Sequence, residues 1–359
     1  MNINLYLSAI MQNLSKINID KSYKLDYYKN NISVLFLVGG YKTMNKKKKE
    51  NSQKTAWVRS VQRELYKNWS LYLLVAVPVV YLIIFKYIPM YGVQIAFKRY
   101  QPVYGIEGSP WVGLDYFKQF ITNYRFWDIM RNTVSISFYS LATFPLAIIL
   151  AVFLNYIPFR KFQKTVQLVS YAPHFISTVV MVSMILQFLD SRNGLVNALI
   201  TALGGESINF MGRKELFYHI YVWSGVWQGI GYSSIIYIAA LAGVSPELHE
   251  AAIMDGATIM KRVWHIDLPS ILPTVMIMFI MQCGSVMSIG YEKVYLMQNS
   301  MNLEVSEVID TYVYKQGLTS AMPKYSYSTA IGLFVSIINI ILLVTVNTIA
   351  KKVSGSSLW

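Results

Sequence analysis

A polar stretch between two long apolar runs holds the residues best suited to charge chemistry. It covers residues 247–274, ELHEAAIMDGATIMKRVWHIDLPSILPT. Glu247 and Glu250 follow Ser245, which can cap a helix, and acids in the first turn of a helix are stabilised by its dipole. Gly256 then permits a turn that a Cβ would hinder. This pattern predicts a polar, acid-led helix followed by a turn.

The other residues of this stretch favour the close approach of a partner. Ala251, Ala252 and Ala257 keep one face of the predicted helix small, so a groove on another chain can come near. A second helix is expected to begin at Met260, and Pro269 marks the return into the next apolar run. We therefore expect a docking helix rather than a plain connecting loop.

Motifs for catalysis or metal binding are missing from the chain. There is no G-x-x-x-x-G-K-[ST] phosphate loop, and GESINFMGRK at residues 205–214 has the wrong spacing. The single cysteine, Cys283, lies in an apolar run, which excludes an intrachain disulfide and a cysteine-based metal site. We therefore expect a chain that is not an enzyme and holds no cofactor or metal itself. The four histidines are scattered and form no H-E-x-x-H: His174, His219, His249 and His265.

Polar and aromatic side chains interrupt two of the apolar runs. Groups of this kind are costly in a membrane, so they usually face the interior of the helix bundle or a wet cavity. Aromatic rings stack on the apolar faces of sugars, and amides, hydroxyls and carboxylates bond sugar hydroxyls, so a saccharide path is one interpretation. Hydrogen bonding between helices and aromatics at the membrane interface are the other. The candidate path residues are Trp227, Gln228, Tyr232, Gln282, Ser285, Ser288, Tyr291 and Glu292.

The composition of the chain is that of a membrane protein. Of its 359 residues, 54% are hydrophobic and 14% are charged, whereas soluble domains carry roughly 25% charge. Several apolar runs reach the roughly 20 residues that a helix needs to cross a bilayer. These runs should be helices, because a bilayer core has no water for unpaired backbone groups. Much of the net charge of +14 precedes the first run, where attraction to anionic lipid explains it without nucleic acid.

The predicted fold class is therefore all-α: a polytopic membrane protein with six transmembrane helices and the polar stretch between the fourth and the fifth. We expect a short interfacial helix within residues 98–131 and a small outer loop with a short helix within residues 190–215. Gly225, Gly229 and Gly231 are expected to allow close helix packing. The six spans are expected at residues 70–97, 133–156, 165–189, 217–240, 270–291 and 328–350.

The flanks of the spans predict the orientation of the chain. Lysine and arginine gather before the first span, in PFRKFQK at residues 158–164 and after the last span, which by the positive-inside rule puts both termini and the polar stretch in the cytoplasm. The expected segments are an N-terminal extension over residues 1–43, a basic cytoplasmic segment over 44–69, a transmembrane domain over 70–350 and a cytoplasmic tail over 351–359.

The first 43 residues do not look like a secretory signal. Gly39 and Gly40 can be encoded by a bacterial ribosome-binding sequence, three codons before Met44. We therefore expect translation to begin at Met44; the alternative is a genuine disordered arm.

The polar stretch resembles the EAA loop of ABC importer permeases. The likeness covers nearly all of residues 66–356, and it is greatest to the sugar-type permeases that take up complex oligosaccharides. YAPHFISTVVM at residues 171–181 and GYEKVYLMQN at residues 290–299 are similar to the third and fifth spans of that group. The matching residues are Glu250-Ala251-Ala252, Asp255-Gly256-Ala257, Ile266, Leu268-Pro269 and Pro273.

The resemblance implies a mechanical role. In this family the EAA loop is the coupling helix that enters a cleft of a cytoplasmic ATPase subunit, so Glu250 would pair with a basic residue of that subunit and Gly256 would hold the bend. ATP-driven closure of the ATPases would then switch access from outside to inside. The residues that the resemblance assigns to coupling are Glu250, Ala251, Ala252, Asp255, Gly256, Ala257, Leu268 and Pro269.

The resemblance also implies partners. The chain would be the permease subunit of an importer for an oligosaccharide or polysaccharide fragment in the cytoplasmic membrane of a bacterium. It would act with a second, different permease, two ATPase subunits that hold ATP and Mg, and an extracytoplasmic solute-binding lipoprotein. The alternatives are a permease for another solute and a polytopic channel or sensor with a cytoplasmic docking helix. A channel or sensor would need charged pore rings or a signalling domain, which the sequence does not show.

Overall fold

The computed structural model describes residues 63–64 and 66–359. The expectations for the N-terminal extension, for the start at Met44 and for most of the basic segment lie outside the described residues. The chain divides into two units, Met1–Pro89 and Met90–Trp359.

In the first unit, helix α3 (Trp69–Leu82) continues through the π-helical turn η1 (Ile83–Tyr87), and no residue of either is buried. A helix that is apolar on all sides is typical of a membrane span. α4 (Ile88–Met90) follows and crosses the boundary between the units.

The second unit is built from helices, and its described residues contain two isolated β-bridges but no strand. In chain order its elements are η2 (Tyr91–Phe97), α5 (Gly105–Gly108), α6 (Asp115–Ile121), α7 (Phe126–Ala142), α8 (Pro145–Tyr156), α9 (Arg160–Tyr171), η3 (Ala172–Phe175), α10 (Thr178–Phe188), α11 (Leu195–Ala202), α12 (Lys214–Ala242), α13 (Pro246–Met254), α14 (Ile259–Arg262), η4 (Val263–Asp267), α15 (Leu268–Cys283), α16 (Glu292–Met297), α17 (Leu303–Ser306), α18 (Ile309–Tyr314), η5 (Lys315–Thr319) and α19 (Tyr325–Ser354).

Five helical runs of the described chain are long and apolar enough to cross a membrane, and the number is six if a bent pair counts as one span. The all-α, polytopic membrane fold is confirmed, and the predicted six spans correspond to the larger of these two counts. The five runs are Trp69–Phe97, Phe126–Tyr156, Lys214–Ala242, Ile259–Cys283 and Tyr325–Lys352.

The bent pair is the predicted third span, which is not one continuous helix. Arg160–Phe175 and Thr178–Phe188 meet at 103°. Pro173 lies in the first turn of η3, and the hydroxyl of Ser177 accepts a hydrogen bond from the N–H of Val180, 3.4 Å away, to start α10. The prediction of a single span over residues 165–189 was wrong in this respect, because a cap and a proline together favour a new helix direction.

The predicted fifth span also has different bounds. Its helix begins at Ile259, where α14, η4 and α15 follow without a break, and it ends at Cys283 rather than at residue 291. Gly284 ends the helix beside α19, where a Cβ would lie 2.3 Å from Cδ1 of Leu343. Gly290, with φ of +87°, turns the chain into α16. Of the path candidates expected on this span, only Gln282 therefore lies on its helix.

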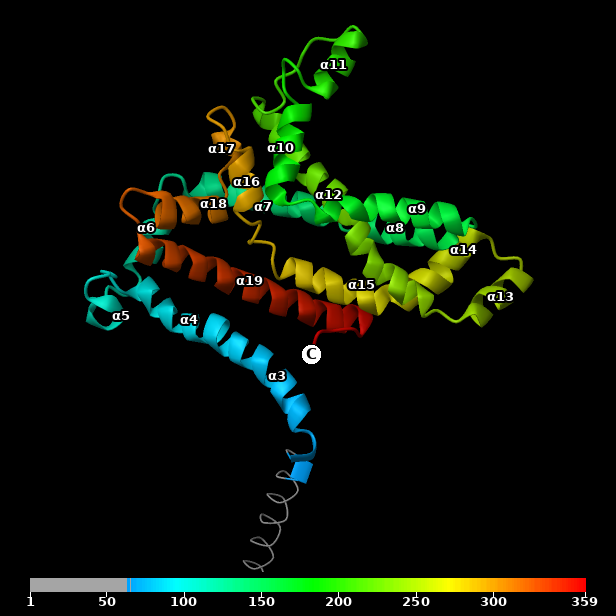
Figure 1. Cartoon of the computed structure of the whole chain (residues 1–359), viewed down its shortest axis with the longest axis horizontal. Coiled ribbons are helices and arrows are strands. Elements are labelled where there is room, and N and C mark those ends of the chain that lie inside the picture. The colour runs from blue at the N-terminus through cyan, green and yellow to red at the C-terminus, as the bar shows by residue number, and fades with distance from the viewer. Residues whose placement is uncertain (1–62, 65) are drawn as a thin grey trace, which may run out of the picture. The chain divides into compact units, whose positions relative to one another are not determined.

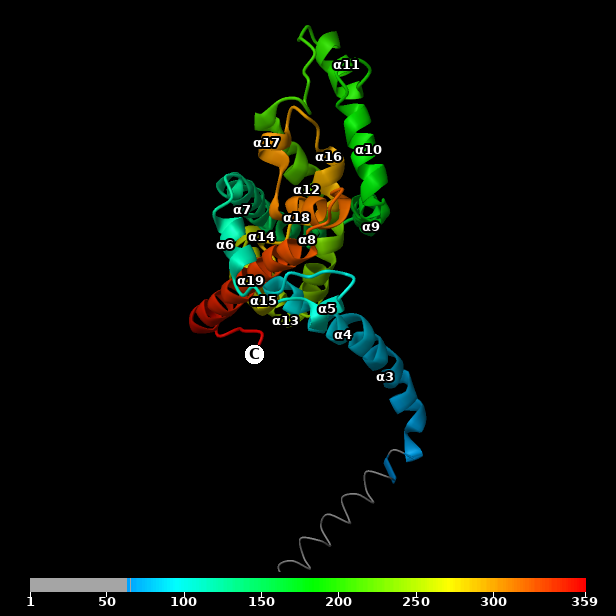
Figure 2. The ribbon, with the colours of Figure 1, turned by 90° about the vertical axis from the view of Figure 1, so that its left-hand side faces the viewer.

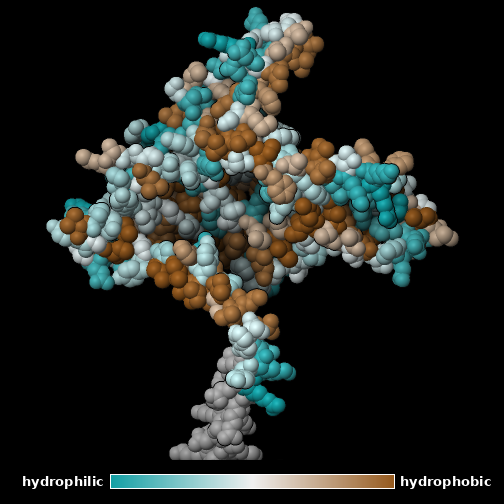
Figure 3. Space-filling view, viewed as in Figure 1, coloured by the Kyte–Doolittle hydropathy of each residue, from teal (hydrophilic) through white to brown (hydrophobic). Residues whose placement is uncertain are grey.

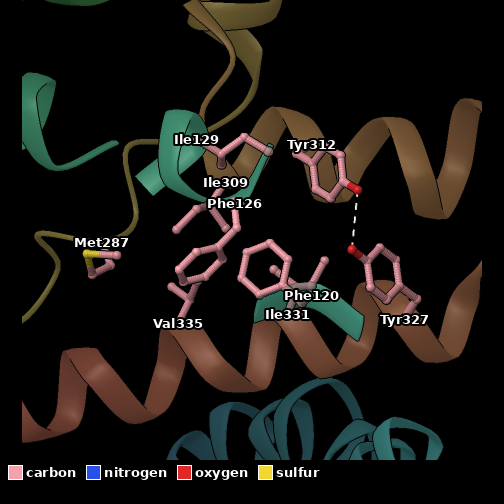
Figure 4. Packing of buried hydrophobic residues seen from close by; sticks show 9 residues of the cluster. All are labelled: Phe120, Phe126, Ile129, Met287, Ile309, Tyr312, Tyr327, Ile331 and Val335. Atoms are coloured by element: carbon pink, nitrogen blue, oxygen red, sulfur yellow. Dashed lines mark hydrogen bonds between the residues drawn. The ribbon is translucent and has the colours of Figure 1, made fainter. Parts of the chain in front are cut away.

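The expected short helix within residues 98–131 is α6, but it belongs to the core. Phe120 of α6 is 1% exposed and packs against Phe126, where α7 and the second span begin earlier than predicted. Figure 3 shows hydrophobic side chains across much of the surface as well, as expected for a protein that faces lipid. Figure 4 shows the cluster that α6 and α7 form with α18 and α19, in which the hydroxyls of Tyr312 and Tyr327 lie 3.2 Å apart.

The second unit carries two projecting parts. α10 and α11 form an arm with α11 at its tip, in agreement with the short helix expected within residues 190–215 (Figures 1 and 2). α13 lies at another extremity, beyond the ends of α12 and α15 (Figure 1). Between them, α12 packs against α8, α9 and α15, and α15 packs against α19.

Candidate functional site

The polar stretch forms the connection between α12 and α15. Pro246 lies in the first turn of α13, as a helix start favours. Ser245 occupies the N-cap position, but its side chain makes no cap hydrogen bond, so the predicted cap is wrong in detail. The next helix, α14, begins at Ile259 and is capped by the hydroxyl of Thr258, which accepts from the N–H of Lys261 at 3.4 Å.

Gly256 forms the turn between α13 and α14 as the sequence predicts. Its φ is +72°, in the left-handed region that a Cβ disfavours. The N–H of Gly256 bonds the carbonyl of Ile253 at 3.0 Å, and the N–H of Ala257 bonds that of Ala252 at 2.8 Å. These two bonds are the Schellman pattern, which closes a helix end and fixes the direction of the chain after it.

The residues that the EAA pattern assigns to coupling lie on α13, in the turn after it and at the start of α15. Glu250, Ala251, Asp255 and Gly256 are exposed. Pro269, at the start of α15, is exposed as well. Ala252, Ala257 and Leu268 are half-buried. Large apolar side chains are also exposed along this segment, a pattern suited to docking: Leu248, Ile253, Met254, Ile259, Met260 and Trp264.

A buried carboxylate connects this segment to the helix bundle. Asp267, at the end of η4, is fully buried and accepts a hydrogen bond from the hydroxyl of Tyr156 on α8, 2.6 Å away. Nε2 of His249 on α13 lies 3.3 Å from its other oxygen, and Arg262 lies over the ring of Tyr156, 5.5 Å from the centroid. Sequence reasoning missed this cluster, although an acid just before the return into the membrane was a signal. Asp267 thus contacts both α13 and α8.

A cavity of about 1000 Å³ lies between α12 and α15. Along α12 its wall runs from Tyr221 to Ala239, and α15 contributes Met278, Met281 and Gln282. Ligand pockets in proteins are usually about 300–1,000 Å³, so this one is large enough for an extended ligand. The candidate path residues that line it are Gln228, Tyr232, Gln282 and Ser285.

Two of these residues also hold the bend in the third span. The amide nitrogen of Gln228 donates to the carbonyl of Ile176 at 3.0 Å, which satisfies a backbone group left free where η3 ends. The ring of Tyr232 stacks on His174 of η3, with centroids 3.9 Å apart. These side chains therefore make contacts between helices and also line the cavity, and the saccharide path stays a prediction.

The remaining path candidates lie apart from that cavity. Ser288 and Tyr291 line a second cavity of about 690 Å³ beside α18 and α19, where Tyr291 stacks on Tyr314 at 4.3 Å. Trp227 and Glu292 line neither cavity. The structure thus separates a group that the sequence placed together, because the chain leaves the helix at Gly284.

Lys293 also lines the larger cavity, although the sequence analysis passed over it. It lies on α16 and reaches α12, where its ammonium donates to the carbonyl of Tyr221 at 2.8 Å and lies 4.4 Å from the ring centroid of the same residue. A lysine directly after the end of a polar, aromatic span was a usable signal.

The glycines of α12 serve different purposes. Gly231 allows close packing as predicted, since a Cβ there would lie 2.2 Å from the carbonyl oxygen of Ser170 on α9. At Gly225 a Cβ would lie 3.2 Å from Nζ of Lys293, so this glycine leaves room for the ammonium. Gly229 has open space where a Cβ would be and lines the cavity.

Comparison with known proteins identifies the family of this chain. Residues 143–355 match the family described as "Binding-protein-dependent transport system inner membrane component". The chain belongs to this family. The resemblance to this family is thereby confirmed, and the chain is a multi-pass membrane permease of a binding-protein-dependent ABC import system, whereas the role of the polar stretch as a coupling loop stays a prediction.

Individual relatives cover most of the permease. Protein LplB of Bacillus subtilis (strain 168) is 42% identical over 305 residues, which are 85% of this chain and 94% of that protein. The polygalacturonan/rhamnogalacturonan transport system permease protein YteP of the same organism is 40% identical over 312 residues, which are 87% of this chain and 95% of that protein.

A solved structure of a bacterial alginate ABC transporter, in complex with a periplasmic protein that holds an alginate pentasaccharide, also matches. Its chain has a TM-score of 0.75 and is 31% identical, with 82% of this chain and 99% of that chain covered.

Proposed function

We propose that this permease passes oligosaccharides through the cytoplasmic membrane of a bacterium, driven by ATPase subunits that dock on α13. The observation that carries the proposal is the covalent connection between the proposed docking helix and the helices that line the cavity. α12 and α15 both line the larger cavity, and the segment from α13 to η4 joins them. A force applied to α13 is therefore delivered to both of these helices, which is what alternating access requires.

The cargo class is supported by the lining of the cavity and by the relatives. Amide, hydroxyl and aromatic groups suit a saccharide, and the relatives are named for polygalacturonan/rhamnogalacturonan and alginate transport. The partners in this proposal are a second, different permease, two ATPase subunits that hold ATP and Mg, and an extracytoplasmic solute-binding lipoprotein. The periplasmic protein in the alginate complex supports the last of these.

The proposed orientation has both termini and α13 in the cytoplasm. Hydrophilic side chains gather at the end of the second unit that carries α9, α13 and α14 (Figure 3). α9 and α14 carry basic residues, which positive-inside placement favours on the cytoplasmic side: Arg160, Lys161, Lys164, Lys261 and Arg262.

Replacement of Glu250 tests the docking. If Glu250 pairs with a basic residue in a partly desolvated cleft of the ATPase, Glu250→Ala leaves that charge unpaired at a cost of about 2–5 kcal/mol. Since each 1.4 kcal/mol is tenfold, ATPase affinity should fall by a factor of about 30 or more. The measurements are co-purification of the ATPase with the permease and uptake into proteoliposomes.

Glu247→Ala is the matched control, because Glu247 is an exposed acid of the same helix, one turn earlier, that lies outside the EAA match. It should leave both measurements close to wild type. A charge-restoring substitution on the ATPase should rescue Glu250→Ala. If Glu250→Ala retains both the ATPase and wild-type uptake, the proposed docking is wrong.

A further inference from the structure

The larger cavity contains one formal charge. Among the described residues that line it, the side chains are apolar, aromatic or neutral polar, and Lys293 is the one that carries a charge at neutral pH. The ammonium lies beside Gly225, where an added Cβ would come 3.2 Å from Nζ. Lys293 therefore gives an otherwise neutral cavity a cation, and no carboxylate lines the cavity with it.

Partners within the chain do not neutralise this cation. Its hydrogen bond goes to the carbonyl of Tyr221, and in the described part of the chain it forms no ion pair. An ammonium has three N–H donors, so two remain for a ligand. By contrast, the buried Glu307 contacts both Arg125 and Lys315. The fold thus pairs the buried carboxylate of Glu307 with two cations. It leaves the ammonium of Lys293 without an anion.

The protonation of Lys293 reflects the same surroundings. α16 lies outside the candidate spans, and desolvation by burial lowers the pKa of Lys293 to about 8, from an ordinary lysine value of 10.5. A carboxylate that came within hydrogen-bond distance would favour the charged form and oppose this shift. An anion in the cavity would therefore favour the charged form of Lys293.

We propose that Lys293 is a specificity-determining contact for a carboxylate, and that the cargo of this permease is an acidic, uronate-containing oligosaccharide. This inference rests on the proposed function, to which it adds the charge of the substrate. Charge-assisted hydrogen bonds are roughly twice as strong as neutral ones, so a single lysine can discriminate an acidic sugar from its neutral counterpart.

The test uses the complete importer in proteoliposomes with its own binding protein at saturating concentration. The probes are short oligogalacturonates and the same chains with their carboxylates methyl-esterified, which removes the charge but keeps the length. Lys293→Gln should lower uptake of the acidic probe by about tenfold or more, since charged hydrogen bonds contribute about 1.5–3 kcal/mol. Lys293→Arg should retain most of it.

Two further variants separate recognition from folding. Gly225→Ala places a methyl group against the ammonium without removing it, so it should lower uptake of the acidic probe in the same direction. Lys118→Gln, on the exposed face of α6, is the matched control and should match wild type. Co-purification of the ATPase and the elution profile of each variant report on assembly.

The outcomes distinguish this inference from the proposed function. Loss of acidic uptake in Lys293→Gln, with retention in Lys293→Arg, supports it. Equal uptake of the acidic probe by wild type and Lys293→Gln overturns it, as does a wild-type importer that accepts neutral oligosaccharides and rejects the acidic ones; in both cases the oligosaccharide importer stands. If the assembled wild-type importer transports no oligosaccharide of either kind, the proposed function itself fails.

Discussion

At the proposed docking end of the permease, the carboxylate of Asp267 accepts a hydrogen bond from Tyr156 and faces His249, while at the cavity the ammonium of Lys293 contacts a carbonyl and a ring. The first charge finds polar partners within the chain, on α8 and α13. The second has no anionic partner within the described residues. Taking a charge out of water is expensive unless it is paired. The difference indicates that Asp267 links two helices, whereas Lys293 is placed to bind an anionic ligand.

The largest effect is expected from Gly256→Val at the docking end. A β-branched side chain is strained at φ of +72°, so the Schellman turn should open and misplace the whole of α13. Uptake should be abolished, and a charge swap on the ATPase should not restore it. Uptake and ATPase co-purification are measured in parallel. Wild-type uptake by this variant would show that the orientation of α13 does not matter.

Asp267→Asn should have the next largest effect. The amide keeps the shape but loses the charge that faces His249 and Tyr156, so the link from α13 to α8 should loosen. We expect the ATPase to remain bound while uptake falls by about tenfold, a loss of about 1.4 kcal/mol. Tyr156→Phe removes only the hydroxyl and should act in the same direction with a smaller effect. Unchanged uptake in both variants, Asp267→Asn and Tyr156→Phe, would mean that the contact between Asp267 and Tyr156 has no role in transport.

Gln228→Ala and Tyr291→Ala should reduce uptake several-fold and leave ATPase assembly intact. Each loses one interhelical contact, which is the size of a hydrogen bond or an aromatic pair, about 1 kcal/mol. Because the two residues line different cavities, their relative effects rank the two as cargo paths. Transport at wild-type rates in both variants, at equal expression, would refute a role for either cavity.

The smallest effect is a dependence on pH. With a pKa of about 8, Lys293 is about nine-tenths charged at pH 7 and about half charged at pH 8. Tyr221, which faces it, stays neutral over this range because a phenol ordinarily titrates near 10. Uptake of an acidic probe should therefore fall about twofold from pH 7 to pH 8 in wild type, but not in Lys293→Arg, whose guanidinium stays charged. A parallel decline in both would assign the effect to another group.

The sequence determined the membrane class and the turn at Gly256 that follows the acid-led helix. Long apolar runs in a solvent without water can form only helices or closed barrels, so the fold class followed from composition and length. Gly256 was equally predictable, because a short acid-led helix followed by glycine and a second helix requires a left-handed turn at that residue. Both are local properties, set by neighbours in the chain.

Tertiary structure alone decided which polar residues share a cavity. Where the fifth-span helix ends, α19 leaves no room for a Cβ at Gly284, a constraint from about 60 residues away that no local pattern contains. The same break moves Tyr291 to a second cavity and brings Lys293 against α12. Likewise, Asp267 and Tyr156 are neighbours only because α8 packs on α12 and places its end beside η4. Helix periodicity predicts which residues share a face of one helix, but the contacts between helices depend on packing.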